Sequence, residues 1–166
     1  MNKAKYSIVV GVDYSAASER ALHEAFALAC TKHGAQLHIV NVRAVPDEPN
    51  PSLGETAASP PLEYWTAELQ EYVARQAAAF QASASAPPFA HLHTYQCVND
   101  PAEELARVAA TIDADLVVVG THEWHGVPRA LGSVAEAVTR LAPCPVLVVR
   151  RKGRPNFEAS RPLAST

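Results

Sequence analysis

Residues 6–13 read Tyr-Ser-Ile-Val-Val-Gly-Val-Asp, a short and nearly continuous apolar run. Strands that are buried on both faces of a parallel sheet have this pattern, because helices cover the sheet from either side. Ser15 then stands where a helix N-cap is expected, and apolar residues recur at helical spacing until Gly34. The chain therefore opens as a buried strand followed by a covering helix.

The same alternation continues along the chain. Four more apolar runs of strand length follow, at residues 35–45, 89–98, 115–120 and 143–149. Three helical patterns separate them, at residues 62–80, 101–112 and 133–141, with Asp100 and Ser133 as the predicted caps of the last two. This order predicts an α/β fold: an open, mostly parallel five-stranded sheet with helices on both faces, Rossmann-like in type. The run at 115–120 is the most apolar, so we expect it to be central.

Two segments fall outside this pattern. Residues 46–61 contain five prolines among polar residues, so they can form neither a helix nor a regular strand and are predicted to be a loop. Residues 152–166 combine glycine, proline and basic residues and are predicted to be a flexible tail. We therefore expect one domain over residues 1–151.

Composition limits the possible functions. The chain is 48% hydrophobic and carries a net charge of -3, which suits a globular protein and leaves no basic surplus for nucleic acid. No stretch approaches the roughly 20 apolar residues of a membrane span, and residues 1–5 lead straight into the first strand without an apolar leader. We therefore expect a cytoplasmic protein with neither a membrane nor a nucleic acid as its partner.

The residue types of metal and redox sites occur without the usual spacing. Cys30, Cys97 and Cys144 form no CxxC pair and are odd in number, so we interpret them as small apolar residues. His122 and His125 are not at the HExxH spacing that places two imidazoles on one helical face. His91 and His93 are interpreted as a polar stripe on an edge strand. We therefore predict no metal site.

Ligands of open parallel sheets bind beyond the carboxyl ends of the strands. The loops at that edge follow Val12, Val42 and Gly120. A carboxylate at Asp13 could accept hydrogen bonds from ribose hydroxyls, or could do no more than stabilise the dipole of the helix that begins nearby. Glycine lets backbone amides approach an anion, and a helix start at Gly132 and Ser133 would add free N–H donors.

Four blocks of the sequence, in the same order and spacing, resemble the universal stress protein family: residues 8–15, 115–122, 131–138 and 142–149. The resemblance covers roughly residues 4–151. It implies an adenine nucleotide alpha hydrolase-like fold, a homodimer and, in the nucleotide-binding members, an ATP site. In those members a loop of pattern G-x2-G-x9-G-[ST] after the fourth strand wraps the phosphates.

Transferred by motif, the resemblance implies a nucleotide site formed by Asp13, Val42, Val119, Gly120, Gly132, Ser133 and Val134. To these we add Ser15 at the first helix start and three residues of the loop, with Gly126 for a tight turn and His122 and Arg129 for donors or positive charge.

The loop departs from the family pattern in two ways. Glu123 stands at the second glycine position, and Gly132 arrives one residue early. A carboxylate about 5 Å from a phosphate charge would cost roughly 3 kcal/mol at an effective dielectric constant near 20. Two hypotheses therefore stay open: a dimeric stress-response regulator that binds ATP, and a dimeric interaction module that has lost nucleotide binding.

An enzyme is the least favoured class. Ser133 lacks the Gly-x-Ser-x-Gly setting of a nucleophile, and no base or metal set is apparent, so we predict no catalytic residues and at most slow ATP hydrolysis. The last strand, Val146 to Val149, would expose an apolar sheet edge in a monomer, so we expect a homodimer that pairs through this edge. The sequence does not identify other protein partners.

Overall fold

The computed structural model describes residues 5–43, 62–86, 89–121 and 131–151. The described elements alternate as the sequence predicts: β1 (Ser7–Gly11), α1 (Ala16–Cys30), β2 (Gln36–Arg43), α2 (Leu62–Ala84), β3 (Leu92–Val98), α3 (Pro101–Thr111), β4 (Leu116–Gly120), α4 (Ser133–Leu141) and β5 (Val146–Val149). The predicted loop at 46–61 and the predicted tail at 152–166 lie outside the described residues.

The five strands form one sheet in the order β3-β2-β1-β4-β5, and every neighbouring pair is parallel. The predicted α/β fold is confirmed. The middle strand is β1, whereas β4, which the sequence placed at the centre, lies between β1 and β5. Apolar content did not distinguish the two strands, because both are interior and both need apolar side chains on two faces.

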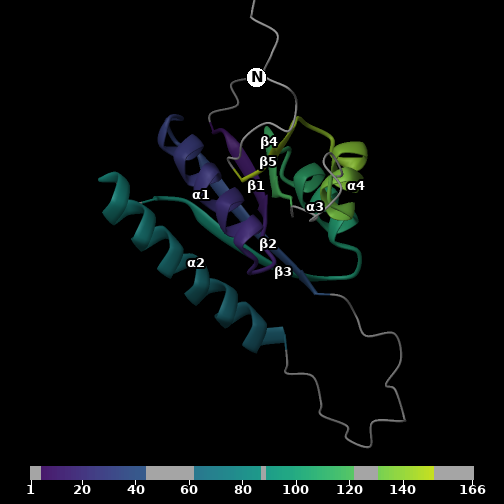
Figure 1. The fold of residues 1–166 in the computed structure, drawn as a ribbon, viewed down its shortest axis with the longest axis horizontal. Coiled ribbons are helices and arrows are strands. Elements are labelled where there is room, and N and C mark those ends of the chain that lie inside the picture. Colours follow the sequence, from purple (N-terminus) through teal and green to yellow (C-terminus); the bar gives the residue numbers. More distant parts are fainter. Residues whose placement is uncertain (1–4, 44–61, 87–88, 122–130, 152–166) are drawn as a thin grey trace, which may run out of the picture.

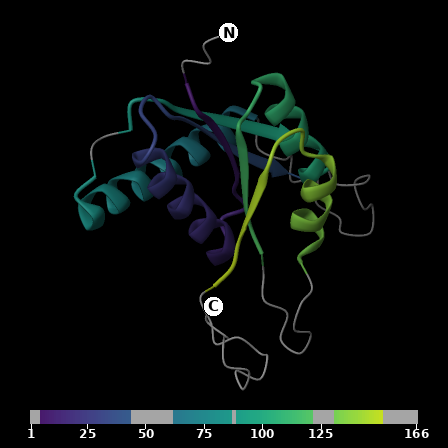
Figure 2. The same cartoon turned by 90° about the horizontal axis from the view of Figure 1, so that it is seen from above.

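Helices cover both faces of the sheet, as Figure 2 shows. One core lies under α1 and α2 and takes Ile8 and Val10 from β1. The other lies under α3 and α4 and takes Val9 from the same strand, with Val117 and Val119 from β4. Because successive side chains of a strand point to opposite faces, two covered faces require the unbroken apolar run that the sequence displays.

Helix caps explain where two of the covering helices begin. The Ser15 hydroxyl accepts a hydrogen bond from the Ser18 amide at the start of α1. At α3 the Asp100 carboxylate accepts from the amides of Ala102 and Glu103. Both residues were predicted as N-caps, because a polar side chain just before an apolar helical pattern marks a helix start within a few residues of sequence.

The predicted cap at Ser133 is wrong. Gly132 is the N-cap of α4 and has no side chain with which to cap the helix start. The Gly132 carbonyl already accepts the first helical bond, from the Glu136 amide, and the Gly132 amide is donated to the Thr121 hydroxyl. Ser133 is therefore the first residue of the helix, one position after the N-cap, and its hydroxyl does not occupy the capping position.

The two outer strands of the sheet are β3 and β5. All four residues of β5 are half-buried, and β4 is its strand neighbour. The predicted position of Val146 to Val149 at the sheet edge is confirmed. His93 is exposed on the other edge strand, β3, as predicted, but its ring also stacks on buried His38 at a centroid distance of 4.7 Å.

Candidate functional site

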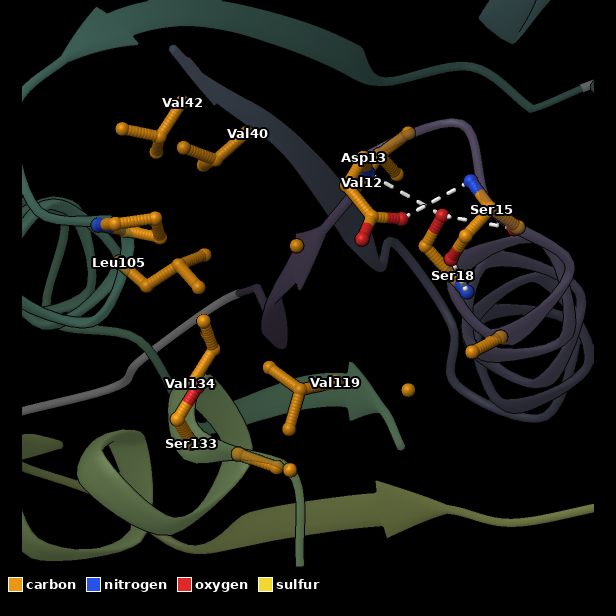
Figure 3. A pocket seen from close by; sticks show the side chains of 16 residues that line it. Val12, Asp13, Ser15, Ser18, Val40, Val42, Leu105, Val119, Ser133 and Val134 are labelled. Atoms are coloured by element: carbon orange, nitrogen blue, oxygen red, sulfur yellow. Dashed lines mark hydrogen bonds between the residues drawn. The ribbon is translucent and has the colours of Figure 1, made fainter. Parts of the chain in front are cut away.

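A hollow of about 240 Å³ lies at the carboxyl edge of the sheet, where β1, β2 and β4 end. This volume is somewhat below the range of roughly 300–1,000 Å³ that is typical of small-molecule sites. The helices α1, α3 and α4 all begin at this edge (Figure 1). Figure 3 shows Asp13 and Ser15 on one side of the hollow and Ser133 and Val134 on the other.

The α1 side of the hollow is held by short-range hydrogen bonds. The Asp13 carboxylate accepts through Oδ1 from the Ser15 amide at 3.0 Å, and the Asp13 amide donates to the Ser18 hydroxyl at 3.2 Å. Ser15 in turn caps the Ser18 amide. The first turn of α1 thus uses its own side chains to satisfy backbone groups, and the Asp13 carboxylate is fixed beside the hollow.

The α4 side of the hollow is different. Gly132, Ser133 and Val134 line it, and among the described residues no side chain caps the first turn of α4. The first amides of a helix have no partner inside the helix, and together with the helix dipole they favour a bound anion. This helix start therefore presents backbone N–H donors toward the hollow.

The floor of the hollow is apolar and includes Val40, Val42, Leu105 and Val119. Gly11 completes it. A methyl group on Gly11 would stand 3.0 Å from Leu105 Cδ1, so the absence of a side chain at Gly11 leaves this space open. The sequence did not indicate Gly11 or Leu105 as site residues, because only the packing of α3 on β1 brings them together.

Gly120 lines the hollow, as predicted, and has a second role that the sequence did not show. A methyl group there would overlap the backbone of Ala17 and lie 2.9 Å from the Ser18 nitrogen. The end of β4 and the start of α1 are in direct backbone contact at this point. Glycine at this position is therefore required by the packing of α1, whether or not an anion binds.

Eight of the predicted site residues line this one hollow: Asp13, Ser15, Val42, Val119, Gly120, Gly132, Ser133 and Val134. The other candidates, His122, Gly126 and Arg129, lie outside the described residues, as does Glu123. The lining residues that the sequence analysis missed are Gly11, Val12, Ala17, Ser18, Val40, Pro101, Leu105 and Ala135. Leu105 and Val40 are apolar like any core residue, so the sequence alone could not assign them to a site.

Asp13 is the only charged side chain among the described residues of the lining. Attraction for an anion must therefore come, in this part of the wall, from backbone amides. Within the described ranges no cluster of three or more histidine, cysteine or acidic residues could hold a metal ion. The described lining also contains no histidine or lysine that could act as a general base for a serine hydroxyl.

The model of the universal stress protein family matches residues 6–150. The chain belongs to this family. A universal stress protein of Methanocaldococcus jannaschii is 46% identical over 61 residues, which are 36% of this chain and 36% of that protein. The chain thus spans about a third of the length of the curated relatives that it matches first.

Solved structures of the family match over more of their length. A family member from Burkholderia pseudomallei is 30% identical, with a TM-score of 0.55, over 86% of this chain and 94% of that one. A universal stress protein solved in complex with cAMP is 25% identical, with a TM-score of 0.59, over 87% of this chain and 96% of that one. No helix in the described ranges is long and apolar enough to cross a membrane.

Proposed function

We propose that this universal stress protein binds an adenine nucleotide in the hollow and acts as a nucleotide-dependent regulatory module. One observation carries the proposal. The first turns of three helices line the hollow; α1 is capped by Ser15 and α3 by Asp100, whereas the N-cap of α4, Gly132, has no side chain to cap it. The α4 start is therefore the place in the described wall where an anion would complete the helix.

The parts of the hollow match the parts of a nucleotide. The amides at the start of α4 suit a phosphate. The Asp13 carboxylate, held by the Ser15 amide, can accept hydrogen bonds from ribose hydroxyls. The apolar floor formed by Val40, Val42 and Leu105 offers a surface for the flat base. The family member solved with cAMP supports the adenine class of ligand.

The number of phosphates is the open choice. The sequence analysis favoured ATP, with Glu123 as the feature against it. The described wall offers one uncapped helix start and no cationic side chain for further phosphate charges. We therefore expect AMP or cAMP to bind at least as tightly as ATP does.

Calorimetric titration tests the proposal directly. AMP, cAMP and ATP, with and without magnesium, would be titrated into the purified full chain, with adenosine as the control that lacks phosphate. We expect a nucleotide to bind with micromolar affinity and adenosine to bind at least tenfold more weakly, because adenosine leaves the α4 amides unused. If millimolar nucleotide produces no heat of binding and no thermal shift, the second hypothesis, an interaction module without a nucleotide, is favoured.

The regulatory part of the proposal concerns assembly. The β5 strand is half-buried at the sheet edge, and such an edge can pair with a second copy across a twofold axis. A homodimer through Val146 to Val149 would place two nucleotide sites on one rigid body for unidentified protein partners to read. A cytoplasmic location stays a prediction, and slow ATP hydrolysis is at most a side activity.

A further inference from the structure

Tyr14 has an unusual backbone conformation at the rim of the hollow. Its φ is +63°, in the left-handed region that residues other than glycine seldom adopt. It stands between Asp13, which lines the hollow, and Ser15, which caps α1. Backbone strain of this kind persists only where surrounding contacts enforce it, and it is concentrated at functional sites.

The contacts that enforce this conformation lie on the other face of the sheet. The Tyr14 ring packs against the core under α1 and α2. It meets the ring of Tyr72, in α2, edge to face with centroids 5.0 Å apart. The guanidinium of Arg43 lies 6.0 Å from the Tyr14 ring and 3.5 Å from the ring of Trp65, also in α2. We call Tyr14, Arg43, Trp65 and Tyr72 the α2 clamp.

The clamp is itself well anchored. Tyr72 is 8% exposed, so its ring has a fixed place in the core. Arg43 also forms an ion pair with Glu68, which lies one turn after Trp65 in α2, at a distance of 3.0 Å. The Arg43 cation is attracted by both aromatic rings and by the Glu68 carboxylate. The Tyr14 ring therefore packs against a buried ring on one side and a paired cation on the other.

On the hollow side, hydrogen bonds fix the chain before and after Tyr14. The Val12 carbonyl accepts from the amide side chain of buried Asn41 at 2.7 Å. The Ser15 amide donates to Asp13 Oδ1 at 3.0 Å. Figure 3 shows the Asp13 carboxylate between this hydrogen bond and the hollow. With both neighbours fixed, the conformation of Tyr14 decides where the Asp13 carboxylate points.

We infer that Tyr14 is a positioning residue of the nucleotide site: its ring, held by the α2 clamp, keeps the left-handed turn that directs the Asp13 carboxylate into the hollow. The inference rests on the proposed function, because it takes Asp13 as a contact of the nucleotide. It assigns to α2, which lies across the sheet from the hollow, a part in forming the site. The ring carries this role, and the hydroxyl does not.

Two observations separate the ring from the hydroxyl. The Tyr14 hydroxyl forms no well-aligned hydrogen bond in the described part of the structure, where its polar neighbour is the Arg43 guanidinium. Burial, followed by the negative charge of Glu68, raises the pKa of Tyr14 above 10, so the phenol is neutral at physiological pH. Tyr14→Phe should therefore preserve the turn. Tyr14→Gly makes the left-handed backbone easy to adopt but removes the ring that fixes it.

The first experiment needs no ligand. The exchange rate of the Ser15 amide hydrogen, measured by NMR, reports whether the Asp13 carboxylate still accepts from it. We expect exchange to accelerate about fivefold or more in Asp13→Ala and to the same extent in Tyr14→Gly. Tyr14→Phe should exchange as the wild type does. Gln70→Ala, which removes an exposed side chain from α2 outside the clamp, is the control and should also leave the rate unchanged.

The second experiment measures cAMP affinity in a double-mutant cycle. We expect Tyr14→Gly and Asp13→Ala each to weaken binding about tenfold, and the double variant to bind no more than twofold more weakly than Asp13→Ala alone, because Tyr14 acts through Asp13. A merely structural role would give additive losses.

Each result decides something. The inference is overturned if the Ser15 amide of Tyr14→Gly exchanges at the wild-type rate. It is also overturned if Tyr14→Phe and Tyr14→Gly lose the same amount of cAMP affinity, or if the losses in the double-mutant cycle are additive. If the wild type binds no nucleotide while the exchange rates behave as expected, the proposed ligand is wrong and the positioning of Asp13 by Tyr14 stands.

Discussion

Gly120 at the end of β4 and Ala17 in the first turn of α1 are in such close backbone contact that a methyl group on Gly120 would overlap the Ala17 carbonyl. This contact sets the distance between the sheet and the helix that carries Ser15 and follows Asp13. It also fixes one wall of the hollow. The proposed nucleotide site therefore depends on backbone packing on one side and, by our inference, on the α2 clamp on another.

Gly120→Ala is expected to lower the free energy of unfolding by at least about 2 kcal/mol, because backbone atoms cannot move aside as a flexible side chain would. Urea denaturation measures the change. The matched control is Gly132→Ala, whose added methyl would meet, among the described residues, nothing closer than the Thr121 hydroxyl at 3.8 Å and whose φ of −58° suits any residue. The control should lose less than about 1 kcal/mol; equal losses in the two variants would contradict this account of Gly120.

Gly132→Asp should separate stability from binding. A carboxylate at the N-cap of α4 would accept from the free amides and complement the helix dipole, raising the free energy of unfolding by up to about 1 kcal/mol. The same carboxylate would occupy the proposed phosphate position, so the affinity for cAMP should fall at least tenfold. A more stable protein that binds less ligand cannot be explained by misfolding.

Two controls accompany Gly132→Asp. Gly132→Asn caps the helix without a charge and should weaken binding less. Ala78→Asp adds the same charge on an exposed position of α2 and should leave affinity unchanged. Nucleotide affinity at the wild-type level in Gly132→Asp would remove the α4 start from the site.

His38 should make the fold sensitive to acid. Burial, followed by the charge of His93, lowers the pKa of His38 from 6.5 to about 4. The unfolded chain therefore takes up a proton at a higher pH than the native protein does. The contribution of neutral His38 to the free energy of unfolding is complete above pH 6.5. It is lost as the pH falls from 6.5 through 4, by up to about 3 kcal/mol.

Urea denaturation at pH 4, 5, 6 and 7 measures this slope. His38→Gln should flatten it, because the residue that titrates has been removed. His33→Gln, at an exposed position after α1, should leave the slope as in the wild type. If His38→Gln retains the full slope below pH 6.5, other groups are responsible for the acid sensitivity.

The β5 edge should mediate dimerisation. The carbonyls of Pro145 and Val149 accept from β4, so by alternation the backbone groups of Val148 face away from the sheet. Val148→Lys and Val148→Pro should both convert a dimer to a monomer in size-exclusion chromatography with light scattering. Thr139→Lys, on the exposed face of α4, is the control for added charge. A dimer that survives both substitutions at Val148 would rule out this edge.

Much of this architecture could be predicted from short stretches of sequence. The run at residues 6–13 and its repeats gave the strands, and Ser15 and Asp100 gave two helix starts. The same local reasoning placed Asp13, Gly132 and Ser133 at one edge, because the carboxyl ends of parallel strands meet there. It placed the cap of α4 one residue too late, since Ser133 carries a capping side chain and Gly132 does not.

The sequence by itself determined the elements, their order and the edge of the sheet that holds the hollow, because periodicity, capping and chain direction act within a few residues. Only the tertiary structure decided that Gly11 leaves space beside Leu105, that Gly120 admits the backbone of α1, and that Tyr14 rests on α2. Each of these contacts joins residues far apart in the chain. Close packing fixes such pairs jointly, so neither member carries a signal of its own.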